Sequence, residues 1–130
     1  MRAQAEFTIT TWEELASDER DGVTIARNHV AKTFTGDIEG ESTAELLMAT
    51  TSQEGSAAYV GFERMTVRVH GRTGTFLLRH AATMARGAPT AEWAIVPDSG
   101  TGDLAGISGS GSIAQDAAGG HTFTLEYEVA

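Results

Sequence analysis

The sequence predicts an all-β protein, a single antiparallel β-barrel of about eight strands that spans residues 1–130. Most segments alternate apolar and polar residues with the period of two that a half-buried strand requires. Turn signals rich in Gly, Asp and Ser separate these segments at regular spacing. No segment shows a convincing helical period. These patterns are typical of a barrel or a sandwich, and the chain is long enough to bury one core.

The first half of the chain contains three predicted strands. AEFTITTW (5–12) places Phe7 and Ile9 on one face. VTIARNHVAKTF (23–34) is rich in β-branched residues, which favours a long second strand. A helix is conceivable within IEGESTAELLMATT (38–51), but its hairpin-like context between glycines favours a strand. The turns are expected at residues 18–22, 35–37 and 52–56.

The middle of the chain forms the clearest predicted hairpin. AAYVGFERMTVRVHG (57–71) alternates throughout, and Glu63 shares its face with apolar side chains. The tight turn GRTG (71–74) connects it to TFLLRHAATM (75–84), where His80 also shares an apolar face. Both strands therefore carry one ionisable residue on the side that is built to be buried.

Three further strands are predicted in the last third of the chain. They are TAEWAIV (90–96), GSGSIAQ (109–115) and HTFTLEYEV (121–129), with turns at 86–89 and 116–120. The final strand directs four apolar residues inward, which are Phe123, Leu125, Tyr127 and Val129.

The glycine-rich stretch PDSGTGDLAGISGSG (97–111) contains Gly100, Gly102 and Ala105 in a G-x-G-x-x-A spacing. A dinucleotide loop with this spacing needs a helix after it, because the helix N-terminus holds the pyrophosphate. No helix can follow here, since further glycines interrupt the chain. We therefore predict turns and a β-bulge between two strands, and no nucleotide.

Part of the same stretch, SGTGDLAGISGSG, is similar to the strand connection of the allene oxide cyclase and dirigent barrels. KTFTGDIEGESTAELLMA, YVGFERMTVRVHGRTGTFLLRH and WAIVPDSGTGDLAGISGSG resemble an uncharacterised family of small bacterial proteins with an allene-oxide-cyclase-like barrel. The resemblance covers about residues 30–111. It implies an eight-stranded barrel that often forms small oligomers. It does not imply allene oxide cyclisation, because Glu6, the early-strand acid, has the opposite parity to Phe7 and Ile9.

The amino-acid composition of the chain excludes several classes of binding partner and cofactor. Eighteen acidic residues against nine basic ones give a net charge of −9, which disfavours nucleic acid and anionic membranes. The absence of cysteine excludes disulfides, thiolate metal sites and cysteine nucleophiles. The four histidines form no paired metal-binding spacing, so we expect no metal and no cofactor. With no signal-like apolar block in its first residues and no apolar run of ~18 residues, a cytoplasmic protein is expected.

Glu63 and His80 are the candidate catalytic residues. A carboxylate on an apolar face has a raised pKa that suits acid–base chemistry, and imidazole titrates in the useful range. The alternative is structural: Glu63 pairs with an arginine, such as Arg79 or Arg64 of a neighbouring subunit, and His80 is a satisfied core histidine. We favour a Glu63 that lines a cavity as a polar group.

The candidate ligand-binding residues are aromatic or cationic. Tyr59, Trp93 and Tyr127 can stack on a flat ligand, or they are plain core aromatics. Arg27 and His29 share a parity with apolar neighbours and face either the barrel mouth or the surface. Arg79 is a further candidate ligand-binding residue.

We therefore expect a small-molecule-binding barrel with a mostly apolar cavity for a small apolar or aromatic ligand, assembled as a dimer or trimer. One alternative is a cofactor-free cyclase, isomerase or hydrolase that uses Glu63 and His80. Another is a structural or interaction protein whose barrel is filled by its own side chains. A cavity in which both groups converge would favour catalysis, and a cavity without that pair would favour binding.

Overall fold

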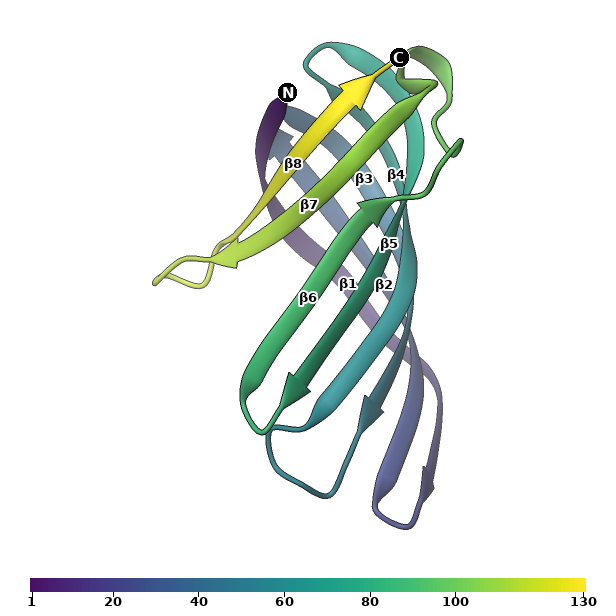
Figure 1. Cartoon of the computed structure of the whole chain (residues 1–130), viewed down its shortest axis with the longest axis vertical. Coiled ribbons are helices and arrows are strands. Elements are labelled where there is room, and N and C mark those ends of the chain that lie inside the picture. The colour runs from purple at the N-terminus through teal and green to yellow at the C-terminus, as the bar shows by residue number, and fades with distance from the viewer.

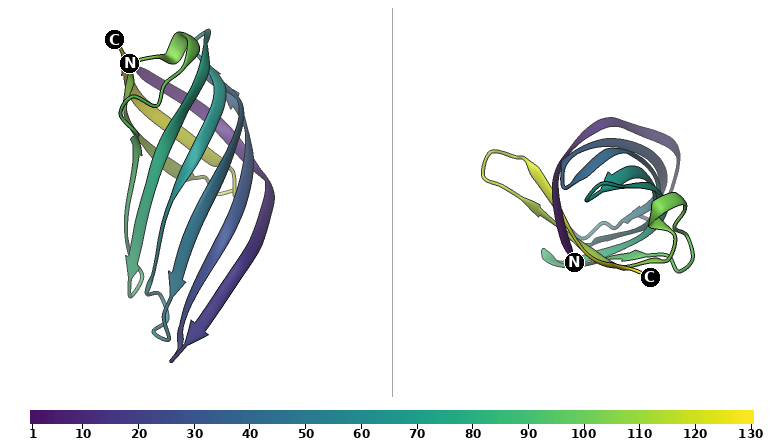
Figure 2. Two further views of the ribbon diagram at one scale, coloured as in Figure 1. Left: turned by 90° about the vertical axis from the view of Figure 1, so that its right-hand side faces the viewer. Right: turned by 90° about the horizontal axis from the view of Figure 1, so that it is seen from above.

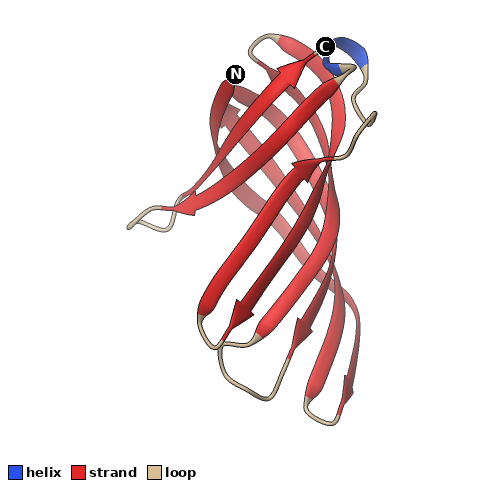
Figure 3. Cartoon of the chain, viewed as in Figure 1, coloured by secondary structure: helices blue, strands red, loops and turns tan.

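The computed structural model covers residues 1–130 and shows eight antiparallel strands in a closed barrel (Figure 1). The strand order around the barrel is the order along the chain, from β1 to β8. Strands and short turns make up almost the whole chain (Figure 3). The strands are β1 (Arg2–Arg20), β2 (Val23–Gly36), β3 (Ile38–Thr50), β4 (Ala57–Val69), β5 (Arg72–Ala85), β6 (Ala88–Ile95), β7 (Ile107–Gln115) and β8 (His121–Val129). None of the helical segments has the length and apolar character that a transmembrane helix needs.

The predicted all-β barrel is confirmed, and the main difference lies in β1. The strand continues to Arg20, so the expected turn at residues 18–22 shrinks to Asp21 and Gly22. Residues 11–20 stay in the sheet because they pair with β2 through two register shifts, after Ile9 and after Glu14. Such bulges bend a strand and increase its twist.

The barrel wall is tightly paired on one side and open on the other. β2 to β5 pair along almost their full lengths. By contrast, β6 meets β7 only at Trp93 and Ala94. β8 meets β1 only between Arg2 and Phe7. Figures 1 and 2 show the β7–β8 hairpin diverging from β6 and projecting from the barrel. The later part of β1 and the start of β6 therefore each have one edge without a partner strand.

The apolar core fills only the end of the barrel near the two termini. Sixteen buried residues form this cluster, among them Phe34, Met65, Phe76 and Phe123. The connection between β6 and β7 closes that end with a short 3-10 helix, η1 (Gly102–Leu104), whose Leu104 is fully buried. A second, smaller cluster of Val30, Ala44 and Leu46 lies farther along the barrel.

The glycine-rich stretch is structural, although the expected bulge is wrong. β7 begins at Ile107 and pairs with β8 through Gln115 without a register shift. Gly102 has a φ of +60°, and a Cβ there would lie 2.8 Å from the carbonyl oxygen of Thr73. Glycine is therefore required for close backbone approach, and no α-helix follows whose N-terminus could hold a phosphate.

Candidate functional site

Four buried polar side chains meet inside the barrel, at the border between the filled core and the open half. Glu63 on β4, Lys32 on β2, Ser42 on β3 and His80 on β5 all point inward because they share the parity of the core residues on their strands. Glu63 is only 1% exposed. A charged group buried this deeply needs partners, and the other three side chains supply them.

Glu63 has three partners. Lys32 Nζ donates a hydrogen bond to Oε1 over 3.2 Å, and the Ser42 hydroxyl donates to Oε2. Nε2 of His80 lies 2.7 Å from Oε1. The His80 N–H is not aligned with the oxygen well enough for a good hydrogen bond. This contact is therefore mainly electrostatic in the present geometry.

The carboxyl group of Glu63 is more acidic than usual in this environment. Burial acts to raise its pKa, but the contact with His80, the charge of Lys32 and the Ser42 hydroxyl outweigh burial and lower the pKa from 4.5 to about 2. Glu63 is therefore ionised at neutral pH. The expectation of a raised pKa is wrong, because partners that favour the charged form surround the group.

Trp93 on β6 determines which ring nitrogen of His80 carries the proton. The Trp93 indole N–H donates a hydrogen bond to His80 Nδ1 over 2.9 Å. An accepting Nδ1 carries no proton, so the neutral ring must carry its proton on Nε2, the nitrogen that faces Glu63. Both ring nitrogens are thus engaged by protein groups.

A cavity of about 220 Å³ lies beside the polar cluster in the open half of the barrel. Side-chain rings make up much of its wall, and both tryptophans of the chain contribute to it. The ring-bearing residues of the wall are Phe7, Trp12, Tyr59, His80, Trp93 and His121. Lys32 is the charged residue of this wall. A second space of about 280 Å³ adjoins it through Met48, Tyr59 and Trp93.

Glu63 itself is closed off from this cavity. It faces a separate interior space walled by Phe34, Leu78 and Phe123, which has no room for a water molecule. Lys32 and His80 line both spaces. Phe7, Trp93 and Ile113 also line both, so these five side chains together separate the cavity from the carboxylate.

One residue of the cavity wall, Trp12, makes an unexpected hydrogen bond to Asn28, which does not line the cavity. Trp12 on β1 donates its indole N–H to Oδ1 of the buried Asn28 on β2 over 3.1 Å. Tyr59 lies with its ring centroid 6.2 Å from that of His80. Burial raises the pKa of Tyr59, as does the nearby charge of Glu63, while Trp93 acts in the opposite direction. Tyr59 therefore presents a neutral phenol to the cavity.

The other predicted ligand residues lie elsewhere. Tyr127 is buried in the filled end of the barrel, where its hydroxyl contacts Nδ1 of His70. Arg27, His29 and Arg79 lie on the outer face of the barrel. For Arg27 and His29 this is the surface position, one of the two alternatives that the sequence had allowed. His29 pairs with Glu45 over 2.8 Å.

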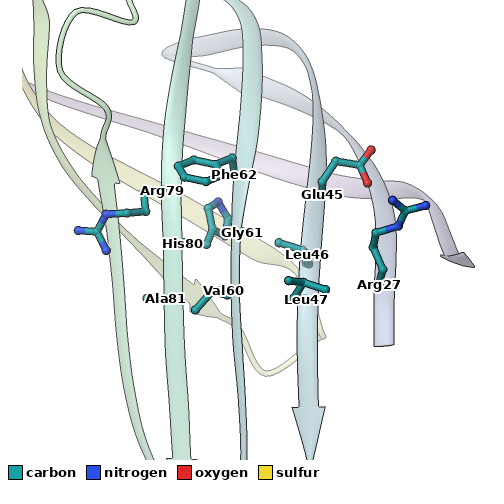
Figure 4. A pocket seen from close by; sticks show the side chains of 10 residues that line it. All are labelled: Arg27, Glu45, Leu46, Leu47, Val60, Gly61, Phe62, Arg79, His80 and Ala81. Carbon is teal, nitrogen blue, oxygen red and sulfur yellow. The ribbon is translucent and has the colours of Figure 1, made fainter. Parts of the chain in front are cut away.

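Arg79 does not reach Glu63; it pairs with Glu92 over 2.6 Å, so the expected arginine partner of Glu63 is corrected to Lys32. Arg64 also has outward parity. An outer groove of about 380 Å³ lies between Arg27 and Arg79, with Leu47, Val60 and Phe62 along it (Figure 4).

Sequence reasoning missed Lys32, Ser42, Trp12 and Asn28. For Lys32 a signal existed, because it alternates with Val30 and Phe34 at a spacing of two. No group of three or more His, Cys, Asp or Glu side chains is placed to hold a metal ion.

Comparisons with known proteins agree with this fold. A crystal structure of a protein of unknown function from the DUF3224 family of Shewanella oneidensis MR-1 is similar to the chain, with 29% identity and a TM-score of 0.90. The match covers 100% of this chain and 98% of the other. No curated protein matches the sequence. The family model described as "Protein of unknown function (DUF3224)" matches residues 3–127, and the chain therefore belongs to the DUF3224 family.

Proposed function

We propose that this protein binds a small, flat and largely apolar molecule in the open half of its barrel. The observation that carries the proposal is the cavity of about 220 Å³ whose wall holds six ring-bearing side chains. Aromatic walls favour flat ligands, which they contact over large areas at little entropic cost. Together with the adjoining space of about 280 Å³, the volume of the cavity falls within the range of ordinary ligand sites, ~300–1,000 Å³.

The uneven filling of the barrel supports a binding role. A purely structural barrel would continue its core along the whole interior, because empty apolar space forfeits packing energy. Here the sixteen-residue cluster ends at the level of Lys32 and Glu63. Beyond that level the side chains are small or line the walls, as Ala44 and Met48 do.

Acid–base catalysis is the second candidate, and the 2.7 Å contact between Glu63 and His80 favours it. Two features oppose it. His80 has no free nitrogen to accept a proton, since Trp93 donates to Nδ1 and Nε2 carries the ring proton. Glu63 has a pKa of about 2 and no access to the cavity. A reaction would require Trp93 to release His80, so we rank binding first.

Native mass spectrometry of freshly purified protein tests the proposal by detecting a co-purified small molecule. The variant Met48→Trp narrows the cavity between its two parts, and Leu47→Trp adds the same side chain to the exposed face of the same strand. We expect an adduct in the parent and in Leu47→Trp, and its loss in Met48→Trp. An adduct that persists in Met48→Trp would contradict binding in this cavity.

We also propose that the chain assembles with further copies of itself through the outer face of β3 to β5. Leu47, Val60 and Phe62 are each about half exposed there. Glu45 and the pair of Arg79 with Glu92 border them, while Arg27 makes no ion pair within the chain. A patch whose rim carries both signs of charge complements a second copy related by a two-fold axis.

A further inference from the structure

Lys32 has hydrogen-bonding capacity that the protein does not use. Its ammonium group carries three N–H donors but makes one hydrogen bond, to Glu63. Its side chain is only 9% exposed. The Phe7 ring lies 4.8 Å from Nζ and covers one side of the group. Buried donors require acceptors, and the direction left for them is the cavity that Lys32 lines.

The charge of Lys32 is already balanced. Glu63 is ionised and accepts from the same ammonium, and Nε2 of His80 lies 2.7 Å from the same carboxylate. A ligand anion would therefore add an unbalanced charge to a poorly hydrated site, which is expensive. The net charge of −9 on the whole chain opposes an anion as well. An uncharged acceptor meets neither obstacle.

The two polar neighbours of Lys32 at the inner end of the cavity, His80 and Glu63, offer no free acceptor. Nδ1 of His80 already accepts from Trp93, and Glu63 is closed off. A ligand hydroxyl placed there would have to leave its own proton unpaired or turn it back toward the mouth. A carbonyl oxygen only accepts, so it fits the donors of Lys32 without a further requirement.

On the basis of the proposed function, we propose that the ligand is an uncharged, flat molecule with a carbonyl oxygen that accepts a hydrogen bond from Lys32 Nζ. Its ring system lies between Tyr59, Trp93 and Trp12, and its carbonyl group points toward β2. Lys32 thus selects the polar end of the ligand, and the aromatic wall holds the remainder.

Three probes of one ring system test this assignment: 2-acetylnaphthalene, 2-ethylnaphthalene and 2-naphthoate. Binding is followed by the quenching of the two cavity tryptophans and checked by calorimetry. We expect the ketone to bind about tenfold more tightly than the hydrocarbon, as a hydrogen bond from a charged donor implies. The infrared carbonyl band of the bound ketone is expected at a lower frequency than in an apolar solvent.

The double variant Lys32→Met/Glu63→Gln removes the donor without leaving a buried charge unpaired. We expect it to bind 2-ethylnaphthalene like the parent and to lose the tenfold preference for the ketone. Equal affinity of the parent for the ketone and the hydrocarbon would overturn the carbonyl assignment while the proposed function stands. Tightest binding of 2-naphthoate would overturn it in favour of an anion site. Binding of none of the three would overturn the proposed function and the carbonyl assignment together.

Discussion

Lys32 and Glu63 form an ion pair inside the barrel, with 3.2 Å between Nζ and Oε1, across two strands that are not neighbours. The intervening strand β3 contributes the hydroxyl of Ser42 to the other carboxylate oxygen. Together with Ser42, the ion pair therefore links three consecutive strands at the level where the packed core ends. Breaking such a pair on one side leaves a buried charge, which costs more than removing both partners.

Replacing Glu63 with Gln is expected to destabilise the fold. The substitution keeps the shape but leaves Lys32 charged and buried, which costs about 3–5 kcal/mol. At neutral pH the melting temperature should fall by more than about 8 °C. The double variant Lys32→Met/Glu63→Gln should recover most of the loss. A single variant that melts with the parent would show that Lys32 finds another acceptor or gives up its proton.

Stability should decrease in acid through Glu63. Its folded-state pKa of about 2 lies below the unfolded value of 4.5, so the contribution is complete above pH 4.5 and disappears as the pH falls toward 2. The shift corresponds to a free energy of unfolding of about 3 kcal/mol. Urea unfolding between pH 6 and pH 2.5 measures it. The double variant Lys32→Met/Glu63→Gln serves as the control, and an identical pH profile for both proteins would exclude this origin.

Trp93→Phe should free Nδ1 of His80. The indole N–H holds the ring with its proton on Nε2, and phenylalanine offers no donor. Imidazole ¹⁵N chemical shifts are expected to report the Nε2–H tautomer in the parent and a mixture of tautomers in the variant. A parent spectrum with the proton on Nδ1 would contradict the assigned hydrogen bond, because two N–H donors would then face each other, and it would leave Nε2 of His80 without a proton and able to accept one. That result would favour the catalytic candidate.

The sequence was sufficient for the strands but not for the site. Period-two alternation fixes the faces of β4 and β5, so Glu63 and His80 were correctly predicted on the inner face. β2 carries apolar residues at both parities, because Val23 and Ile25 lie outside and Val30 lies inside. The signal at Val30, Lys32 and Phe34 was therefore offset by the opposite parity of Val23 and Ile25, and spacing alone could not pair Lys32 with Glu63.

Spacing along the chain also hides contacts between distant strands. Trp93 meets His80 because β5 and β6 pair in a register that places the two residues opposite each other. Trp12 reaches the interior because register shifts after Ile9 change which residues of β1 point inward. Neither the register of β6 nor the position of a bulge can be read from alternation alone.

Phe62→Glu should interfere with self-association. Phe62 is 53% exposed at the centre of the outer patch, so its replacement leaves the core intact and places a charge in the proposed interface. Analytical ultracentrifugation at micromolar concentration is expected to show a dimer for the parent and a monomer for the variant. Thr66→Glu, on the same outer face of β4 but away from the patch, is the control. A monomeric parent would rule out the proposed assembly.

Gly102→Val should lower the stability of the protein, because the glycine serves the fold and does not bind a nucleotide. Gly102 has a φ of +60°, which a β-branched residue rarely adopts, and a Cβ would lie 2.8 Å from the carbonyl oxygen of Thr73. The expected cost is about 1–3 kcal/mol for the backbone strain alone. The loss is expected to reach the core because Gly102 begins η1, and Leu104 at the end of η1 is fully buried in the packed end of the barrel.

Gly71→Val separates strain from crowding in the same measurement. Gly71 also has a positive φ, +81°, but nothing lies within 4 Å of a Cβ built on it. Thermal melts should therefore show a smaller loss for Gly71→Val than for Gly102→Val, since only Gly102 approaches another backbone closely. NAD and ATP should leave the melting temperature of the parent unchanged, because the glycines are followed only by the three-residue η1 and by β7, and not by an α-helix whose N-terminus could hold a phosphate. A dose-dependent rise with either nucleotide would show that the connection binds phosphate and that its glycines serve a ligand.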